Sequence, residues 1–211
     1  MNTGAFLLVA LAAVAAVVDW VAVVDKDQKL EYLCKPLTVV LLIGVALVME
    51  PDSTTMRTWF VAALVFSLAG DLFLMLKERD LFVLGLASFL ISHVAYVLGF
   101  LVGGVSILGL LGGLVVAGAS VGLVGSRIVK SAQEREPQLM GPVMAYMGVI
   151  SAMLAVAIGS GDTVAVMGAV LFYVSDALIG WTKFVRDVKW APLAIIVTYH
   201  LAQIALVTSL A

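Results

Sequence analysis

Residues 58–76 read TWFVAALVFSLAGDLFLML, an apolar run that contains one carboxylate, Asp71. A second run, residues 163–183, reads TVAVMGAVLFYVSDALIGWTK and contains Asp176. Both runs are long enough to cross the hydrocarbon core of a bilayer, which is about 30 Å thick. Because an ionised carboxylate in hydrocarbon is costly, each acid is expected to face the protein interior and to serve a function there.

The composition is that of a membrane protein. Of the 211 residues, 63% are hydrophobic and 12% are charged, whereas soluble domains carry roughly 25% charged residues. The net charge of −2 offers no basic surface for nucleic acid, and the single cysteine, Cys34, cannot form an intrachain disulfide. No loop is long enough to bury a core of its own, so residues 1–211 are expected to form a single transmembrane helical domain.

Eight apolar stretches of about 18–22 residues are expected to cross the bilayer. They lie near residues 4–24, 32–49, 58–76, 81–102, 105–124, 138–158, 163–183 and 190–210. The first stretch lacks the positively charged segment that begins a signal peptide, so we expect an uncleaved helix. The sequence therefore predicts an all-α membrane protein with eight transmembrane helices.

The basic residues predict the orientation in the membrane. Of the 12 Lys and Arg residues, all except Arg57 lie in or beside the first, third, fifth and seventh connections. They are Lys26, Lys29, Lys35, Lys77, Arg79, Arg127, Lys130, Arg135, Lys183, Arg186 and Lys189. By the positive-inside rule these connections face the cytoplasm, and both termini lie on the non-cytoplasmic side of a plasma or inner membrane.

Features of the chain recur at about half its length. Asp71 and Asp176 are 105 residues apart, and the two histidines of the chain are 107 residues apart. We therefore expect two parallel four-helix repeats, approximately residues 1–104 and 105–211, related by an axis along the membrane normal. In that arrangement the two acids would face each other across the axis.

The two acids are the candidate catalytic residues. Asp71 and Asp176 are each expected about 10 Å inside the cytoplasmic boundary, since six or seven residues separate them from the next lysine. Two carboxylates in one low-dielectric pocket are expected to hold a proton between them, which is the arrangement that general acid and general base catalysis requires. A nearby carboxylate also stabilises an oxocarbenium-like transition state.

Further polar residues accompany the acids in the apolar runs. Lys35 and Tyr146 are expected at the depth of the acids, and His93 one or two turns deeper. The candidate supporting residues are Lys35, His93, Tyr96, Tyr146, Tyr199 and Gln203. Each also has a structural interpretation: the lysine as an anchor that reaches the interface, and the others as packing or interhelical hydrogen bonds.

Asp19 and His200 stay outside this set. Asp19 is next to Trp20 at the end of the first helix and is expected at the membrane interface rather than in a catalytic site. His200 has no assigned role. Two histidines in different helices are a weak metal signature, and neither a metal nor an organic cofactor is predicted.

The ordered set of short polar motifs resembles the YhhN family of lysoplasmalogenases, integral membrane hydrolases with eight predicted spans. The motifs are Lys35-Pro36 in the second helix, Gly70-Asp71-Leu72-Phe73-Leu74 in the third, His93-x-x-Tyr96 in the fourth, Phe172-x-x-Ser175-Asp176 in the seventh, and Tyr199 with Gln203 in the eighth. Each motif is short, and only the complete set in this order is specific. Asp19 and His200 are not part of the pattern.

The resemblance implies hydrolysis of the vinyl ether bond of lysoplasmalogens to a fatty aldehyde and glycerophosphoethanolamine or glycerophosphocholine. On this hypothesis Asp71 and Asp176 are the acid and the base, in an order that the sequence leaves open. Lys35 would hold the lipid phosphate near the cytoplasmic leaflet, and Tyr146 and His93 would orient water or a carboxylate. The expected partners are a lysophospholipid and the bilayer, without nucleic acid; the sequence does not predict an oligomeric state.

A proton-coupled membrane transporter is the alternative function. Parallel repeats with intramembrane Asp and His residues also describe such carriers. A carrier needs access from both faces of the membrane, however, and the polar residues of this chain are concentrated near one face. A purely structural subunit would leave the paired acids without a purpose.

Overall fold

The computed structural model describes residues 1–76 and 81–211, which contain helices and no strands. The first four helices are α1 (Thr3–Asp25), α2 (Gln28–Val48), α3 (Thr54–Met75) and α4 (Phe82–Gly103). They are followed by α5 (Ile107–Ser120), the π-helical turn η1 (Val121–Gly125), α6 (Ser126–Arg135), the 3-10 turn η2 (Pro137–Leu139), α7 (Met140–Ser160), α8 (Thr163–Phe184) and α9 (Ala191–Thr208). The basic residues Lys77 and Arg79, which were used to predict the orientation, lie outside the described residues.

Eight helical segments of the described chain are long and apolar enough to cross a membrane, which confirms the predicted all-α membrane fold. The fifth segment differs from its predicted range. It does not end near residue 124 but continues through η1 into α6 and ends at Arg135. A π-helical turn keeps the backbone hydrogen-bonded, so the basic residues Arg127 and Lys130 lie on a helix and not in a loop.

Polar side chains fix where several helices begin. Asn2, Asp27, Ser53, Ser106 and Asp162 each accept a hydrogen bond from a backbone N–H in the first turn of the helix that follows. Such N-caps satisfy amide groups that have no partner within the helix. Short polar connections can therefore end one apolar helix and start the next at a defined residue.

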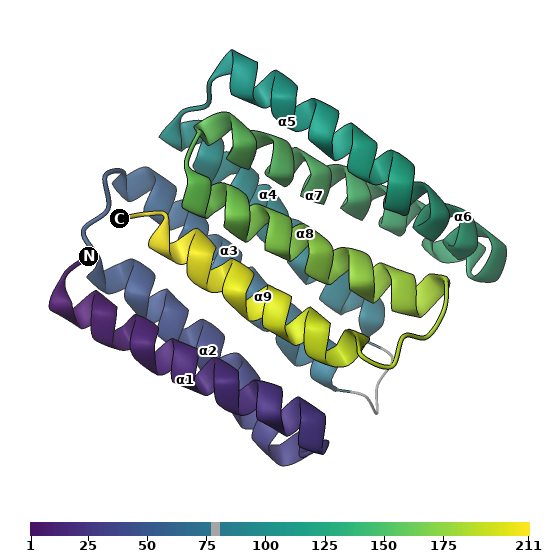
Figure 1. Cartoon of the computed structure of the whole chain (residues 1–211), viewed down its shortest axis with the longest axis horizontal. Coiled ribbons are helices and arrows are strands. Elements are labelled where there is room, and N and C mark those ends of the chain that lie inside the picture. The colour runs from purple at the N-terminus through teal and green to yellow at the C-terminus, as the bar shows by residue number, and fades with distance from the viewer. Residues whose placement is uncertain (77–80) are drawn as a thin grey trace.

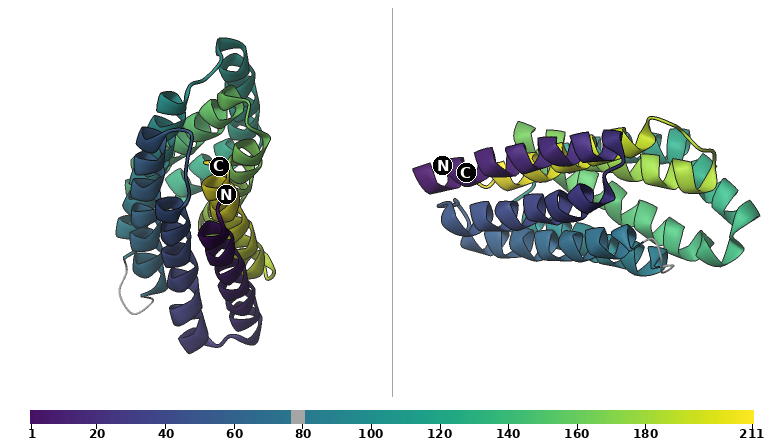
Figure 2. Two further views of the ribbon diagram at one scale, coloured as in Figure 1. Left: turned by 90° about the vertical axis from the view of Figure 1, so that its left-hand side faces the viewer. Right: turned by 90° about the horizontal axis from the view of Figure 1, so that it is seen from below.

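The helices run side by side along the bundle (Figure 1). The main packing pairs are α1 with α2, α3 with α4, α5 with α7, and α8 with α9, while α4 packs against α7 and α9 packs against α1 and α2. In the right-hand view of Figure 2, α1 and α9 form a layer over α2, α3 and α4. Corresponding helices pair in each half of the chain, but the internal repeat and its division at residues 104 and 105 stay predictions.

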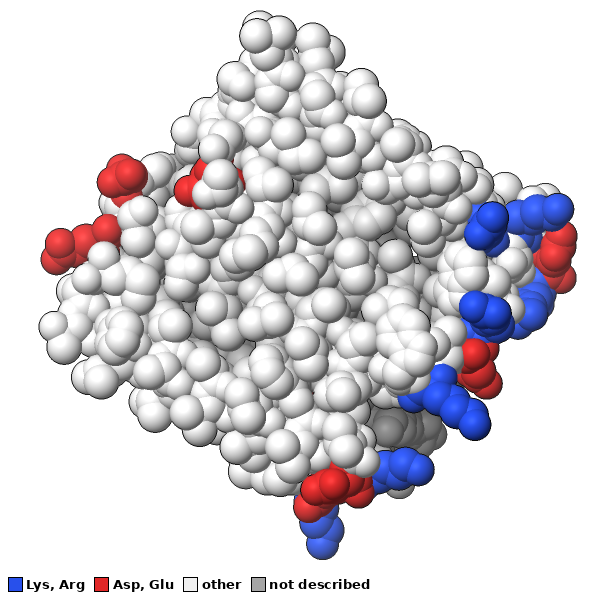
Figure 3. Space-filling view, viewed as in Figure 1, with Lys and Arg blue, Asp and Glu red and all other residues white. Residues whose placement is uncertain are grey.

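Charged side chains gather at the two ends of the bundle. In Figure 3 the Lys and Arg side chains cluster at the end opposite the two termini marked in Figure 1, and only acidic side chains are seen near the termini. We call the first end the basic end; its residues include Lys26, Lys29, Lys130, Lys183 and Lys189. Large apolar side chains are exposed between the ends, as Leu108 of α5 is at 84%, and such a surface is stable in lipid rather than in water.

Candidate active site

Asp71 of α3 lies buried in the half of the bundle nearer the basic end and has a cation beside it. Its side chain is 1% exposed. The Lys35 ammonium nitrogen of α2 lies 3.2 Å from Oδ1, and the Tyr199 hydroxyl of α9 donates a hydrogen bond of 2.6 Å to Oδ2. Both contacts favour the ionised carboxylate, because a buried charge is stable only when it is paired and hydrogen-bonded.

Glycines bring α4 close to α3 beside this carboxylate. A Cβ at Gly70 would lie 2.6 Å from the Phe89 ring, and a Cβ at Gly85 would lie 2.5 Å from the Leu74 side chain. Any larger residue at either position would push the two helices or these side chains apart. The glycine of the Gly70-Asp71 motif therefore allows the contact between α3 and α4 that sets the position of Phe89.

Asp176 of α8 has a phenol and an imidazole as partners. The Tyr146 hydroxyl of α7 donates a short hydrogen bond to Oδ2, and Nε2 of His93 in α4 lies 3.3 Å from the same oxygen. The other oxygen, Oδ1, has no hydrogen-bond partner among the described residues. Side chains of α4 and α7 therefore contact one carboxylate oxygen, and the second is available for a hydrogen bond to another group.

The contact between His93 and Asp176 requires a shared proton. Nδ1 of His93 lies 2.5 Å from the Phe89 carbonyl oxygen, which can only accept, so Nδ1 carries hydrogen. In the neutral imidazole Nε2 is then an acceptor, and it faces the carboxylate oxygen of Asp176. Two acceptors repel each other unless a proton lies between them, so this pair holds one proton, on the carboxyl group or on the ring.

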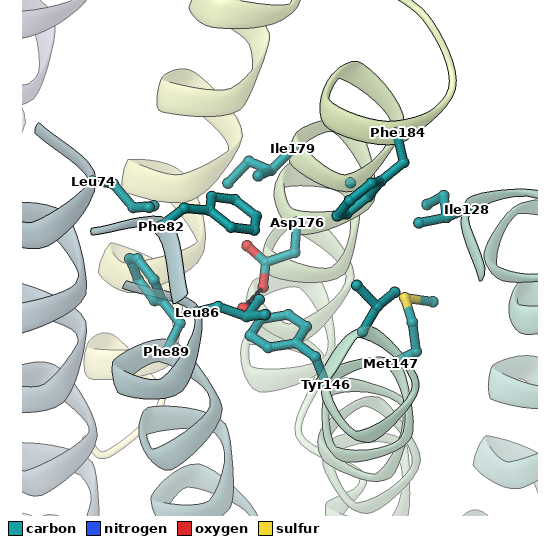
Figure 4. Close-up of a pocket in the computed structure, with 12 residues that line it drawn as sticks. Leu74, Phe82, Leu86, Phe89, Ile128, Tyr146, Met147, Asp176, Ile179 and Phe184 are labelled. Atoms are coloured by element: carbon teal, nitrogen blue, oxygen red, sulfur yellow. Dashed lines mark hydrogen bonds between the residues drawn. The ribbon is translucent and has the colours of Figure 1, made fainter. Parts of the chain in front are cut away.

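An apolar pocket opens beside Asp176, bordered by α3, α4, α6, α7 and α8. Its lining residues are Leu74, Phe82, Leu86, Phe89, Ile128, Val143, Tyr146, Met147, Asp176, Ile179, Gly180 and Phe184. Figure 4 shows the Asp176 carboxyl group between the rings of Phe82 and Tyr146. The free space of the pocket is about 490 Å³ with the open mouth included. Asp176 is the one carboxylic acid among the lining residues.

A second cavity, the polar groove, lies at the basic end and is bordered by α1, α2, α3, α8 and α9. It is lined by Val23, Lys26, Gln28, Glu31, Lys35, Leu74, Thr182, Pro192, Ile195 and Ile196. Lys26, Lys35 and Glu31 are its charged lining residues, and Lys35 connects it to Asp71. Leu74 lines both the polar groove and the apolar pocket, so one side chain lies at the border of the two cavities.

The two carboxylates do not line one common pocket, contrary to the sequence-based expectation. Asp176 lines the apolar pocket, whereas Asp71 is not among the described residues that line either cavity. Aromatic rings lie between them: Phe172 has its centroid 5.5 Å from that of Tyr199 and 4.6 Å from that of His93. The two acids therefore occupy adjacent sites on opposite sides of an aromatic layer, each with its own hydrogen-bond partner.

Tyr96 and Gln203 contact each other and not the acids. Both are fully buried, and the Tyr96 hydroxyl donates a hydrogen bond of 2.6 Å to Oε1 of Gln203. Tyr96 also packs edge-on against Phe172, with ring centroids 6.4 Å apart. These two residues lie one helical turn farther from the basic end than His93 and Tyr199, where they support the aromatic layer.

The side chain of Asp19, which was predicted at the membrane interface, is buried within the bundle. Its side chain is 0% exposed, and so is that of His200. The adjacent Trp20 donates a hydrogen bond of 3.2 Å to Nδ1 of His200. Sequence spacing could not reveal this contact, because it joins α1 and α9 across 180 residues.

The titratable groups form no metal site within residues 1–76 and 81–211, where no cluster of three or more His, Cys, Asp or Glu side chains could hold an ion. The chemistry that these residues offer is proton transfer. The Asp176–His93 pair faces an apolar pocket, and Asp71 with its partner Lys35 lies near the polar groove. This combination suits acid–base catalysis on an amphiphile.

Comparison with known proteins identifies similar chains. The model of the YhhN family matches residues 30–210. Human lysoplasmalogenase TMEM86B is 35% identical over 180 residues, which cover 84% of this chain and 74% of that protein. Human lysoplasmalogenase TMEM86A is 31% identical over 159 residues, or 72% of this chain and 65% of that protein.

The mouse protein named lysoplasmalogenase TMEM86B is 33% identical over 153 residues. The match covers 72% of this chain and 63% of the mouse protein. The chain thus spans about three quarters of human TMEM86B and just under two thirds of the other two relatives. No solved structure matches the chain.

Proposed function

Because the chain belongs to the YhhN family, we propose that it is a lysoplasmalogenase, a multi-pass membrane enzyme that hydrolyses the vinyl ether bond of lysoplasmalogens. The products are a fatty aldehyde and glycerophosphoethanolamine or glycerophosphocholine. The observation that carries the proposal is the contact between Asp176 and His93 at the wall of an apolar pocket, from which we infer a proton held between them. A vinyl ether becomes reactive when its β-carbon is protonated, and this site holds an acid in contact with a lipid-like environment.

The two cavities suit the two parts of a single-chain phospholipid. The alkenyl chain occupies the apolar pocket, where it contacts Leu86 and Phe89. The phosphate lies in the polar groove near Lys26 and Lys35, since an ammonium group binds a phosphate by charge and hydrogen bonding. The glycerol and the ether bond then lie at the border of the cavities, beside Leu74.

Asp176 acts as the general acid. It transfers its proton to the β-carbon of the vinyl ether, and the positive charge that forms is shared by the α-carbon and the ether oxygen. The Asp176 carboxylate left behind stabilises this oxocarbenium ion. Tyr146 holds Oδ2 in place through its hydrogen bond, the same oxygen that faces His93.

Asp71 acts as the general base. Lys35 and Tyr199 stabilise its carboxylate, which takes a proton from the water that adds to the α-carbon. The hemiacetal then collapses: protonated Asp71 returns its proton to the leaving ether oxygen, and the Asp176 carboxylate takes the hydroxyl proton as the aldehyde forms. Both acids recover their starting states, and each turnover consumes one water.

The enzyme acts at the leaflet that faces the basic end, which we assign to the cytoplasm by the positive-inside rule. The concentration of Lys and Arg side chains at that end supports this orientation. A carrier function is not favoured, because the relatives that cover most of the chain are named as hydrolases.

The direct test is product formation by the purified chain in lipid nanodiscs. We expect incubation with lysoplasmenylethanolamine to release a fatty aldehyde and glycerophosphoethanolamine in equal amounts, detected by mass spectrometry. The matched control is the 1-O-alkyl analogue, which has no double bond to protonate and should remain intact. Absence of aldehyde, or equal cleavage of the alkyl ether, would contradict the proposal. In sealed proteoliposomes a carrier would instead move the labelled lipid without changing it.

A further inference from the structure

Asp19 of α1 is a buried acid that lacks a hydrogen-bond partner in the described part of the chain. Neither of its carboxylate oxygens is bonded, and its side chain is 0% exposed. Nε2 of the fully buried His200 is also without a partner there. Polar groups left without protein partners in an interior are costly, and bound water commonly satisfies them.

His200 contributes a hydrogen-bond donor to this interface. The Trp20 nitrogen Nε1, which can only donate, lies 3.2 Å from Nδ1 of His200. Nδ1 is therefore the acceptor, and Nε2 of the neutral ring carries the hydrogen. The bond to Trp20 places His200 where α1 packs against α9, and within the described residues no hydrogen bond joins its Nε2 to Asp19, the residue next to Trp20.

Lys35 lies at the same depth as Asp19. Asp19 precedes the end of α1 at Asp25 by six residues, and Lys35 follows the start of α2 at Gln28 by seven, so the hairpin places them at one level. Lys35 and Asp71 are near enough to act on Asp19 electrostatically. Lys35 nevertheless forms its ion pair with Asp71 and not with Asp19. Asp19 and the Lys35–Asp71 ion pair are therefore neighbours that do not contact each other directly.

The polar groove leads to these atoms. Val23 and Ile196 line the groove, and they lie one helical turn from Asp19 and His200, respectively. Lys35 lines the groove as well and contacts Asp71. Asp19 and His200 therefore lie one helical turn beyond residues that line the polar groove, on the side away from the basic end.

The proposed hydrolysis needs a supply of water, since it consumes one water in each turnover while its protons return to the two acids. The apolar pocket beside Asp176 offers little to hold a water molecule. We propose that Asp19 and His200 form a water-binding site at the inner end of the polar groove and position the water that Asp71 activates. This inference rests on the proposed function. Both residues are positioning residues, since they act through water and do not contact the lipid.

Radiolytic footprinting of the full chain in nanodiscs tests the site directly. X-ray exposure after rapid mixing with ¹⁸O-labelled water oxidises side chains beside exchangeable bound water, even when they are buried. We expect His200 to take up the label in the wild-type protein and to lose it in Asp19→Leu. An unlabelled His200 in the wild-type protein would overturn the proposal, and this measurement does not depend on whether the variant folds.

Kinetics test the role in catalysis. Asp19→Leu should lower kcat about tenfold with little change in KM, because water supply is impaired while lipid binding is not. Asp19→Asn keeps hydrogen-bonding capacity and should retain most of the activity. The matched control is Thr38→Val, which removes a buried hydroxyl whose hydrogen bond is to its own helix, and it should be fully active. A purely structural Asp19 predicts that the leucine variant keeps its kcat.

The two proposals fail in different ways. Aldehyde release by a wild-type protein whose His200 is unlabelled refutes the water site and leaves the hydrolase function intact. Labelled His200 without aldehyde release refutes the hydrolase function. The bound water would then have no role in hydrolysis.

Discussion

Asp71 and Asp176 are the same residue type in two neighbouring sites with different surroundings. Asp71 is paired with the ammonium group of Lys35, which lines the polar groove, and is itself not among the residues that line either cavity. Asp176 has a phenol and an imidazole as partners and lines an apolar pocket. The difference teaches that the environment assigns each acid its role: a cation favours the carboxylate, and an apolar wall with a facing acceptor favours the protonated form.

The largest effect is expected from Asp176→Asn. Asparagine preserves the shape and can still accept the Tyr146 hydrogen bond but cannot transfer a proton, so kcat for aldehyde release should fall by about 10²–10⁴-fold. The matched control is Asp162→Asn in the same helix, where asparagine remains a good N-cap, and it should be fully active. Near-normal activity of Asp176→Asn would break the assignment of the two roles.

The ion pair makes a prediction about stability. Asp71→Asn leaves the ammonium of Lys35 buried without its counter-ion and should cost about 3–5 kcal/mol of unfolding free energy. In the double variant Lys35→Met and Asp71→Asn no unpaired charge remains, so stability should recover while activity stays low. Thermal unfolding in detergent measures the stability of the single and the double variant, and aldehyde release measures their activity. Equal stability of Asp71→Asn and Asp176→Asn would contradict the contrast between the two sites.

A bulky residue in the apolar pocket tests where the chain binds. Leu86→Trp fills space beside Asp176 and should raise KM for long-chain lysoplasmalogens by about tenfold, with a smaller increase for short-chain substrates. Leu84→Trp is the control, because Leu84 lies on the same helix with a side chain that is 49% exposed toward the surroundings. The same KM change in both variants would show that the alkenyl chain does not bind in this pocket.

The smallest effect distinguishes the two tyrosines. Tyr199→Phe removes a hydrogen bond to a charged acceptor, whose loss is expected to cost about 1.5–3 kcal/mol. Tyr146→Phe removes one from an acceptor that shares a proton with His93, and about 0.5–1.5 kcal/mol is expected. Chemical unfolding measures the free energy that each variant loses. If Asp176 rather than Asp71 is the ionised acid, Tyr146→Phe should lose more than Tyr199→Phe.

The sequence predicted the helical fold because hydropathy and length alone define segments that can cross a bilayer. It misplaced the end of the fifth segment, since Arg127 and Lys130 resemble a polar loop when the π-helical turn before them is not known. The short polar N-caps, by contrast, are local signals, and the structure places helix starts beside them.

For the site, the sequence identified the residues but not their grouping. The matched spacing of Asp71 and Asp176 suggested one shared pocket. Which partners each acid contacts depends on how α3 and α8 are rotated about their axes. The periodicity of one helix does not determine its rotation relative to another helix. Asp19 was assigned to the interface for a similar reason. Its burial depends on the packing of α1 against α9, a contact between the two ends of the chain.

Leu74 at the border of the apolar pocket and the polar groove has a consequence for inhibitor design. A fragment with a hydrocarbon tail and a fragment with an anionic head would bind on either side of this one side chain. A short linker across Leu74 could join them, and the second fragment would then bind at a high effective concentration. A linked compound of this kind would occupy both cavities at once and block access to either acid.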